Sequence, residues 1–294
     1  MNKNNYVFPK IGLGTWKIGG DVVANPDNDD EKDIKAIVYA IEKGITHIDT
    51  SESYSGGKSE EIVGKALKRV NRDDIFIATK VREWNLKYND LIKSCEESLK
   101  RLEIDYIDLY YVHKQNPNIE IKETCDALNY LLDKGLIKEV GLSNVGIKTI
   151  EEFNKYLNKK IYAVQNQYNL VCRESQKKKI IDYCTNNNIK FIAWRPITLS
   201  YPGVKDKFYK SGTYKMLDDI AKKYNKSNVQ IAIRWLIEQP NVHIIFKSNN
   251  IDHIDEILDT YNFSLEEKDW NELNTNFPVM FDKGCTENEF FEVS

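Results

Sequence analysis

Four side chains that could exchange protons with a carbonyl group occupy the ends of consecutive predicted strands. Asp49, Lys80 and His113 each lie at the end of such a strand, and Tyr54 follows Asp49 in the next turn. A free tyrosine has a pKa of about 10, and a nearby ammonium group favours its ionised form. The spacing therefore predicts a single site in which a phenol, an amine, a carboxylate and an imidazole act together.

The residue types suggest a task for each group. Lys80 could lower the pKa of Tyr54, and Asp49 could keep Lys80 charged and oriented, since an unpaired buried charge is costly. His113 could orient a substrate carbonyl by hydrogen bonding. Tyr54 would then be a general acid that protonates the carbonyl oxygen, and a nicotinamide cofactor would have to supply the hydride.

Strand and helix patterns alternate along the chain that carries these residues. Short β-branched runs predict strands at 11–15, 46–50, 74–81, 106–113, 137–144, 162–169, 190–197 and 242–248. Amphipathic runs predict helices at 30–44, 59–70, 88–102, 121–135, 147–157, 174–188, 227–239 and 251–261. Strands joined through helices by short links are parallel, and eight such units predict an α/β fold of the (β/α)8 TIM barrel type, in one domain over residues 1–294.

An open, doubly wound sheet is the main structural alternative. It normally carries a GxGxxG phosphate-binding turn after the first strand. Here Gly12 and Gly14 are followed by Lys17 where the third glycine would stand, which disfavours that fold. Gly44 and Gly135 directly precede strands, where they are expected to end helices. In a barrel, catalytic residues lie at the carboxyl ends of the strands, which is where the four side chains are predicted.

Composition restricts the partners and the compartment. The net charge of −3 gives no reason to expect nucleic-acid binding. No apolar run approaches the roughly 20 residues needed to span a bilayer, and the first residues lack the apolar stretch of a secretory signal. Five dispersed cysteines without a CxxC pair fit a reducing cytoplasm, and no Cys/His spacing predicts a metal site. We therefore expect a cytoplasmic protein that binds neither membrane nor metal.

Taken together, the strand-end segments resemble those of the aldo-keto reductase family. "HIDTSESY" is similar to the family's "IDTAxxYG" block, and "TKV" and "YYVH" are similar to its Lys and His strand ends. The resemblance extends over nearly the whole chain. It implies a catalytic tetrad of Asp49, Tyr54, Lys80 and His113, an NAD(P)H-dependent reduction of an aldehyde or ketone to an alcohol, and a monomer.

The second half of the chain resembles the cofactor-binding blocks of the same family. "GLSNVG" implies that Ser143 and Asn144, with Gln165, bind the nicotinamide carboxamide. Trp194 stands where the family has an aromatic residue that stacks on the nicotinamide ring. "FKSNN" implies that Lys247 and Ser248 reach the adenosine phosphate, which favours NADP(H) over NAD(H).

Several positions depart from the family pattern. His253 stands where an arginine often binds the 2′-phosphate of NADP, and histidine lacks the bidentate geometry of arginine. Arg195 replaces a small residue and is expected to contact the pyrophosphate or ribose. Many members have a tryptophan after the catalytic histidine, and here Trp16 and Trp84 are predicted to line the substrate pocket instead. The tail 277–294 is expected near the pocket.

Other functions remain open at this stage. The fold also resembles the β subunits of potassium channels, which would make the chain a catalytically weak NADP-binding regulatory subunit. A Schiff-base aldolase would use Lys80 as a nucleophile, but a charged lysine is not nucleophilic. His47 and His243 are interpreted as packing residues, and the lysines at 177–179 as a solvated helix face.

Overall fold

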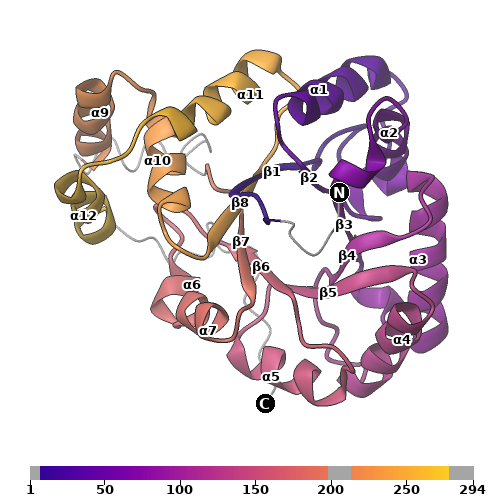
Figure 1. The fold of residues 1–294 in the computed structure, drawn as a ribbon. Helices are drawn as coiled ribbons and strands as arrows, with labels where there is room; N and C mark the ends of the chain where they lie inside the picture. Colours follow the sequence, from indigo (N-terminus) through magenta and orange to yellow (C-terminus); the bar gives the residue numbers. More distant parts are fainter. Residues whose placement is uncertain (1–6, 198–212, 278–294) are drawn as a thin grey trace.

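A ring of helices surrounds a barrel of strands (Figure 1). The structure is a computed structural model that describes residues 7–197 and 213–277. Within these residues, eight parallel strands pair in chain order, and the last pairs with the first, so that the sheet closes. The predicted single-domain (β/α)8 barrel is confirmed. The tail 277–294 was predicted to approach the pocket, and all of it beyond Phe277 lies outside the described residues.

Almost entirely buried residues form the strands, most of them apolar. The strands are Ile11–Gly14 (β1), His47–Asp49 (β2), Phe76–Val81 (β3), Ile107–Val112 (β4), Ile137–Ser143 (β5), Ala163–Gln167 (β6), Lys190–Trp194 (β7) and Val242–Phe246 (β8). Polar side chains occur in β2 and β6. Parallel strands covered on both faces are apolar almost throughout. The interior of the barrel is tightly packed: a Cβ on Gly141 would lie 2.4 Å from the ring of Tyr111, so only glycine fits there.

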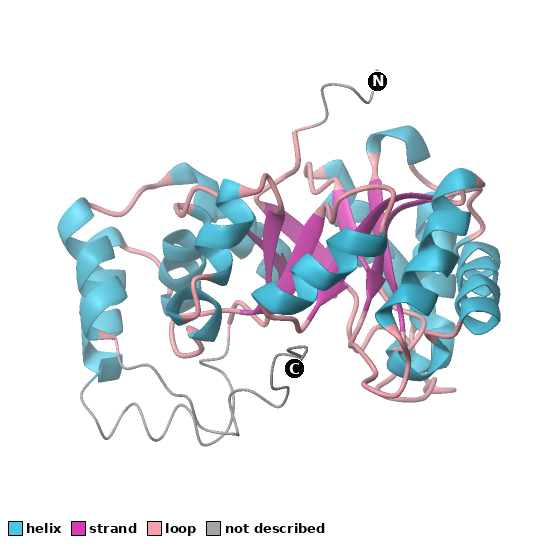
Figure 2. Cartoon of the chain, turned by 90° about the horizontal axis from the view of Figure 1, so that it is seen from below, coloured by secondary structure: helices cyan, strands magenta, loops and turns pink. Residues whose placement is uncertain are grey.

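Amphipathic helices cover the outside of the barrel and flank its strands in the side view (Figure 2). They are Asp30–Glu42 (α1), Lys58–Leu67 (α2), Tyr88–Leu102 (α3), Ile121–Asp133 (α4), Ile147–Tyr156 (α5), Glu174–Lys177 (α6), Ile180–Asn186 (α7), Thr213–Tyr224 (α9), Asn228–Ile237 (α10), Ile251–Leu258 (α11) and Glu267–Asn276 (α12). In α1, Ile34 and Ile37 are buried, and Asp29 caps the first turn by accepting a hydrogen bond from the backbone of Lys32. Gly44 follows with a φ of 98°, as predicted for a residue that ends a helix.

The helices differ from the sequence-based expectation in two places. The helix predicted over 174–188 is divided into α6 and α7, because Lys179 adopts a left-handed conformation with a φ of 60°. Lys177, Lys178 and Lys179 are exposed, which confirms the solvated lysine face. Helix α9 was not predicted, and neither was the extent of α12.

Two of the four histidines lie at the amino-terminal end of the barrel and not in the pocket. His47 is fully buried, with its ring 4.8 Å from that of Phe8 and 5.9 Å from that of Phe76. His243 is also buried, and its Nδ1 lies 2.8 Å from the carbonyl oxygen of Pro9. Their interpretation as packing residues is confirmed.

The described residues contain neither a disulfide nor a cluster of side chains suited to a metal ion. Cys95, Cys125, Cys172 and Cys184 are free and buried, whereas Cys285 lies outside the described ranges. No helix in the described part of the chain is long and apolar enough to cross a membrane.

Candidate active site

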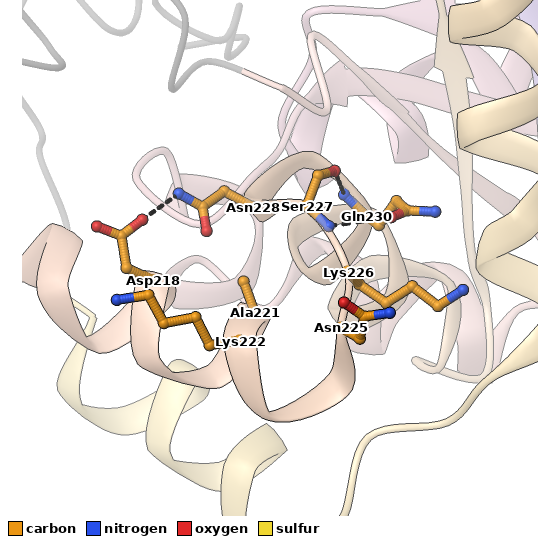
Figure 3. Close-up of a pocket in the computed structure, with 8 residues that line it drawn as sticks. All are labelled: Asp218, Ala221, Lys222, Asn225, Lys226, Ser227, Asn228 and Gln230. Carbon is orange, nitrogen blue, oxygen red and sulfur yellow. Dashed lines mark hydrogen bonds between the residues drawn. The ribbon is translucent and has the colours of Figure 1, made fainter.

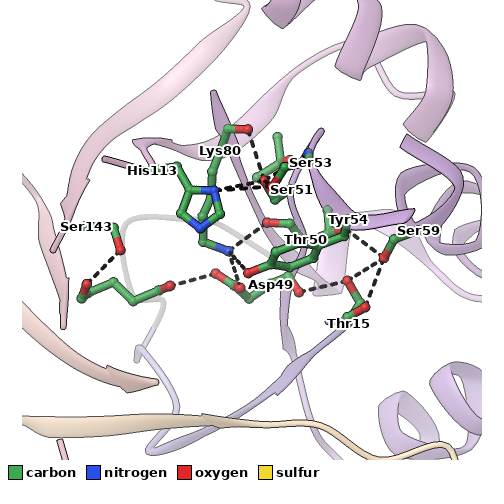
Figure 4. Close-up of polar contacts among 12 residues, drawn as sticks. Thr15, Asp49, Thr50, Ser51, Ser53, Tyr54, Ser59, Lys80, His113 and Ser143 are labelled. Atoms are coloured by element: carbon green, nitrogen blue, oxygen red, sulfur yellow. Dashed lines mark hydrogen bonds and ion pairs between the residues drawn. The ribbon is translucent and has the colours of Figure 1, made fainter. Parts of the chain in front are cut away.

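A buried ion pair joins the ends of β2 and β3. Nζ of Lys80 lies 2.5 Å from Oδ1 of Asp49, and neither side chain reaches solvent (Figure 4). The ammonium group also donates to the carbonyl oxygen of Thr50 at 2.8 Å. The other carboxylate oxygen accepts a hydrogen bond from Nε2 of Gln165, on β6, at 2.8 Å. Both charges are therefore hydrogen-bonded, as buried charges must be.

The third donor of the Lys80 ammonium points to Tyr54, whose hydroxyl lies 3.2 Å from Nζ. Burial alone would lower the pKa of Lys80, but the carboxylate of Asp49 and the phenol of Tyr54 outweigh it and raise the pKa above its usual value. Lys80 is therefore a cation at neutral pH. It stabilises negative charge on the tyrosine oxygen whenever that oxygen gives up its proton.

Tyr54 begins a short 3-10 turn after β2 and lies partly open to the cavity. Its ring packs edge-on against those of Trp16, at 5.1 Å, and His113, at 5.9 Å. Burial raises the pKa of the Tyr54 phenol, and the ammonium group of Lys80 opposes this rise without cancelling it. This differs from the expectation of a lowered pKa. The phenol keeps its proton at neutral pH, as a general acid must.

His113 directly follows β4, and its backbone is fixed on both sides. Its N–H donates to the carbonyl oxygen of Val81 at 2.9 Å, and its own carbonyl oxygen accepts from Nδ2 of Asn144 at 3.1 Å. Burial, with the charges of Lys80 and Arg82, lowers the pKa of His113 to about 3. The imidazole is therefore neutral at neutral pH and can donate one hydrogen bond and accept one.

A cavity of about 690 Å³ opens at the carboxyl ends of the strands. Its lining includes most of the predicted site residues: Trp16, Asp49, Tyr54, His113, Ser143, Asn144, Gln165, Trp194, Arg195, Lys247, Ser248 and His253. Lys80 lies beneath this lining, behind Tyr54. The lining thus brings together residues from the ends of seven strands, and Lys80 adds the end of β3.

Trp84 is the exception among the predicted residues. It does not line the cavity, and its side chain is 58% exposed. The guanidinium group of Arg82 lies over its ring, 5.2 Å from the centroid, and this cation–π contact orients the ring outside the pocket. Trp84 therefore lies outside the cavity that the sequence predicts it to line.

One part of the cavity fits a nicotinamide carboxamide. Oγ of Ser143 donates to the backbone carbonyl of Gln165 at 2.8 Å and accepts from Nδ2 of Asn144 at 3.1 Å. Oδ1 of Asn144 is buried and has no hydrogen-bond partner among the described residues, although buried polar atoms normally have one. An amide N–H₂ of a cofactor would satisfy it. Trp194 ends β7 in the same lining, with the guanidinium group of Arg195 5.2 Å from its ring centroid.

The opposite end of the cavity fits a phosphate group. Lys247 and Ser248 directly follow β8, and His253 is exposed on α11. Burial lowers the pKa of Lys247, whose Nζ donates to Oδ1 of Asn249 at 3.3 Å. Oγ of Ser248 accepts the backbone N–H of Asn250 at 3.0 Å. The cation and the helix start beside it are suited to an anion.

Among the lining residues that were not predicted as site residues, four lie outside the predicted strands and the quoted motifs: Val22, Val229, Glu256 and Ile257. Glu256 follows His253 by three positions on α11, so the helical spacing could have placed it on the same face. Val22 and Val229 carry no such signal.

A separate hollow of about 450 Å³ lies where α9 meets α10 (Figure 3). Four of its polar residues already bond to one another: Nδ2 of Asn228 donates to Asp218 at 2.6 Å, and Ser227 and Gln230 form a capping box at the start of α10. These contacts account for the polar residues as helix-end interactions, and we assign no function to this hollow.

Comparisons with known proteins agree with this geometry. The model of the aldo/keto reductase family matches residues 10–275. Aldo-keto reductase YhdN of Bacillus subtilis (strain 168) is 33% identical over 301 residues, covering 90% of this chain and 89% of the relative. Methylglyoxal reductase DkgA of Escherichia coli (strain K12) is 33% identical over 270 residues, covering 91% and 89%.

Solved structures agree in both fold and length. The thermostable aldo-keto reductase Tm1743, in complex with the inhibitor epalrestat, superposes with a TM-score of 0.86 at 34% identity, over 93% of this chain and 97% of that one. An aldo/keto reductase from Klebsiella pneumoniae, in complex with NADP and acetate, superposes with a TM-score of 0.83 at 26% identity, over 97% and 95%.

Proposed function

We propose a mechanism from the premise that this chain belongs to the aldo/keto reductase family. It is an oxidoreductase that reduces an aldehyde or ketone to an alcohol, with NADP(H) as the cofactor. One observation carries the mechanism: Nζ of Lys80 lies between the carboxylate of Asp49 and the hydroxyl of Tyr54. No other described lysine is fully buried.

Tyr54 is the general acid of this mechanism. NADP(H), when bound, would supply the hydride that the carbonyl carbon requires. The oxygen of the substrate lies against the hydroxyl of Tyr54 and the imidazole of His113, and Tyr54 donates its proton to that oxygen as negative charge develops there. Lys80 stabilises the tyrosine oxygen that has lost its proton, and Asp49 keeps Lys80 charged and aimed. The interactions of Lys80 and His113 with the two oxygens become stronger as negative charge develops in the transition state. Interactions that favour the transition state over the ground state accelerate the reaction.

The cofactor-binding roles follow from the two ends of the cavity. We assign Ser143, Asn144 and Gln165 to the carboxamide, on the basis of the unpartnered Oδ1 of Asn144. Trp194 would stack on the nicotinamide ring, and Arg195 would contact the pyrophosphate or ribose.

At the other end, Lys247 and Ser248 bind the 2′-phosphate of NADP. His253 supplements them in the position where many members have an arginine. Because histidine cannot form the bidentate contact of arginine, Lys247 has the largest share in distinguishing NADP from NAD.

For the substrate, we propose small aldehydes, including 2-oxoaldehydes such as methylglyoxal. Support comes from the Escherichia coli relative named for that activity and from the aromatic rings of Trp16 and Trp194 in the cavity lining. We further propose that the protein acts as a monomer in the cytoplasm, where thiols remain reduced. Light scattering of the purified protein would test the oligomeric state.

Neither alternative function gains support from the geometry. A Schiff-base aldolase needs an uncharged lysine, whereas the pKa of Lys80 is raised and its ammonium group has three hydrogen-bond acceptors. A regulatory role does not require the proton-donating arrangement around Tyr54.

The decisive experiment combines binding and turnover. NADPH is titrated against the purified protein while tryptophan fluorescence is followed, and methylglyoxal is then added while the nicotinamide absorbance is recorded. We expect tight binding followed by oxidation. Binding without oxidation of any aldehyde would favour the regulatory alternative, and failure to bind either NADPH or NADH would overturn the proposed function.

A further inference from the structure

The Nδ1 atom of His113 faces two serine hydroxyls instead of the cavity (Figure 4). Oγ of Ser51 lies 3.3 Å from Nδ1, and Oγ of Ser53 lies 3.4 Å from it. The two hydroxyl oxygens are 2.9 Å apart. Ser51 is fully buried, so bulk water does not compete for its contacts. One ring nitrogen of His113 thus lies against a fixed hydroxyl pair.

A network of hydrogen bonds holds this pair in place. The backbone N–H of Ser53 donates to Oγ of Ser51 at 3.2 Å. Between them, the buried Glu52 accepts the backbone N–H of Arg82 at 2.8 Å and the side-chain amide of Asn85 at 3.2 Å. The guanidinium group of Arg82 donates to the carbonyl oxygen of Glu52 at 3.0 Å. These contacts attach the serine turn to the segment that follows β3.

The hydroxyl protons of this pair need acceptors. Oγ of Ser51 already accepts a hydrogen bond from the backbone N–H of Ser53. Besides the other serine, two acceptors lie near the pair: Nδ1 of His113 and the carbonyl oxygen of Lys80. The carbonyl oxygen is 3.4 Å from Oγ of Ser51, and it also accepts the backbone N–H of Glu52 at 3.4 Å. Nδ1 accepts a hydrogen bond only when the imidazole proton is on Nε2.

The Nε2 atom lies on the side of the ring away from the serines, and His113 lines the cavity beside Tyr54. A proton on Nε2 would therefore be presented to a bound substrate. In the other tautomer, Nε2 would present a lone pair to the carbonyl oxygen, and the two would repel each other. The choice of tautomer decides whether His113 assists the reaction.

We propose that Ser51 and Ser53 are positioning residues that hold His113 in the tautomer protonated on Nε2, so that it donates a hydrogen bond to the substrate carbonyl. The family block "IDTAxxYG" has alanine where this chain has Ser51, so the shared motif does not supply this hydroxyl. The inference rests on the proposed function for the task of His113. The tautomer itself is a property of the protein before any substrate binds.

Nuclear magnetic resonance of the ¹⁵N-histidine-labelled protein tests the tautomer without turnover. Two-bond and three-bond ¹⁵N–¹H correlations report which ring nitrogen carries the proton, and a His113→Asn variant assigns the signals. We expect the proton on Nε2, and an Nδ1 resonance typical of a hydrogen-bond acceptor. In a Ser51→Ala/Ser53→Ala variant, the Nδ1 resonance should move toward the position of a free imidazole nitrogen.

Kinetics provide the second readout. The double variant should lose about tenfold in kcat, the factor expected for one misplaced hydrogen bond. Its affinity for NADPH should be unchanged. A Ser53→Thr variant keeps the hydroxyl and should retain both the resonance and kcat. Ser98→Ala is the matched control, because Ser98 is a buried serine that bonds to Arg101 and not to His113.

A proton on Nδ1 of His113 in the parent protein would overturn the inference. So would a double variant with the ring resonances and kcat of the parent. If the double variant does not fold, Ser53→Ala provides the same comparison at a partly exposed position, and unchanged resonances there would count against the inference. A parent protein that shows the Nε2 tautomer but reduces no aldehyde would refute the proposed function and leave the tautomer assignment intact.

Discussion

The hydroxyl oxygen of Tyr54 lies 3.2 Å from Nζ of Lys80, within reach of a direct hydrogen bond. A Tyr54→Phe variant removes the proton donor and keeps the ring packing against Trp16 and His113. We expect kcat for aldehyde reduction to fall by about 10²–10⁴-fold, the usual contribution of a positioned general acid, with NADPH binding unchanged. Steady-state kinetics with a fluorescence titration will test this. Full activity in the variant would exclude Tyr54 as the acid.

The buried ion pair makes a prediction about stability. Lys80→Met leaves the Asp49 carboxylate buried with its hydrogen bond to Gln165 but without a cation. We expect the free energy of unfolding to fall by about 3–5 kcal/mol. Adding Asp49→Asn removes the charge while keeping an acceptor for Gln165, so the double variant should recover part of that loss. Urea unfolding of the parent, both single variants and the double variant measures the coupling. If the double variant loses as much stability as the two single variants together, the two side chains do not form a direct ion pair.

The phosphate end of the cavity makes a prediction about cofactor choice. Lys247→Met should weaken NADPH binding by about 10–100-fold, the range for losing one charge-assisted hydrogen bond, and should affect NADH much less. His253→Arg should strengthen NADPH binding, because arginine can form a bidentate contact with phosphate. Equal losses for both cofactors would assign Lys247 to the pyrophosphate that they share.

Burial of the histidines makes a prediction about acid stability. Burial lowers the pKa of His47 to about 3 and that of His243 to about 4, below the value of about 6.5 expected in the unfolded chain. As the pH falls through 6.5, the unfolded chain binds protons that the folded protein excludes. The free energy of unfolding should therefore decrease from pH 6.5 toward pH 3.

His47→Leu isolates this effect. Both ring nitrogens of His47 lack hydrogen-bond partners within the described residues, so leucine should cost little stability at pH 7. Between pH 7 and pH 5, the variant should lose about 2 kcal/mol less stability than the parent. His253→Asn, at an exposed position, is the control and should follow the parent. If the free energy of unfolding depends on pH in the same way in the parent and in His47→Leu, His47 is not buried as a neutral imidazole.

Much of the fold could be predicted, because short strand-like segments alternate with amphipathic helical runs along the chain. The proximity of Asp49, Tyr54, Lys80 and His113 was predictable, because a barrel places the carboxyl ends of all its strands on one face. The division between α6 and α7 was not predictable, because apolar spacing continues past Lys179 and does not reveal its left-handed backbone. The site could be predicted only in part. The sequence places Trp84 in a loop near the pocket, but it does not show that the ring lies against Arg82, outside the pocket.

The lining of the cavity at the carboxyl ends of the strands could also be predicted only in part. Its motif-bearing residues were predictable, but Val22 and Val229 reach it through the packing of a loop and of α10. The serine pair beside His113 was part of the quoted motif, yet only the folded distances reveal its relation to the imidazole.

The seam of the barrel also affects how the chain can fold during its synthesis. Ile11 of β1 pairs with Ile244 of β8, and the backbone N–H of Ile244 donates to the carbonyl oxygen of Lys10 at 2.8 Å. The first strand therefore cannot find its second neighbour until β8 has left the ribosome. Until then, β1 exposes an unpaired edge to which other chains could add. While the second half of the chain is translated, this edge is therefore open to the addition of strands from other chains.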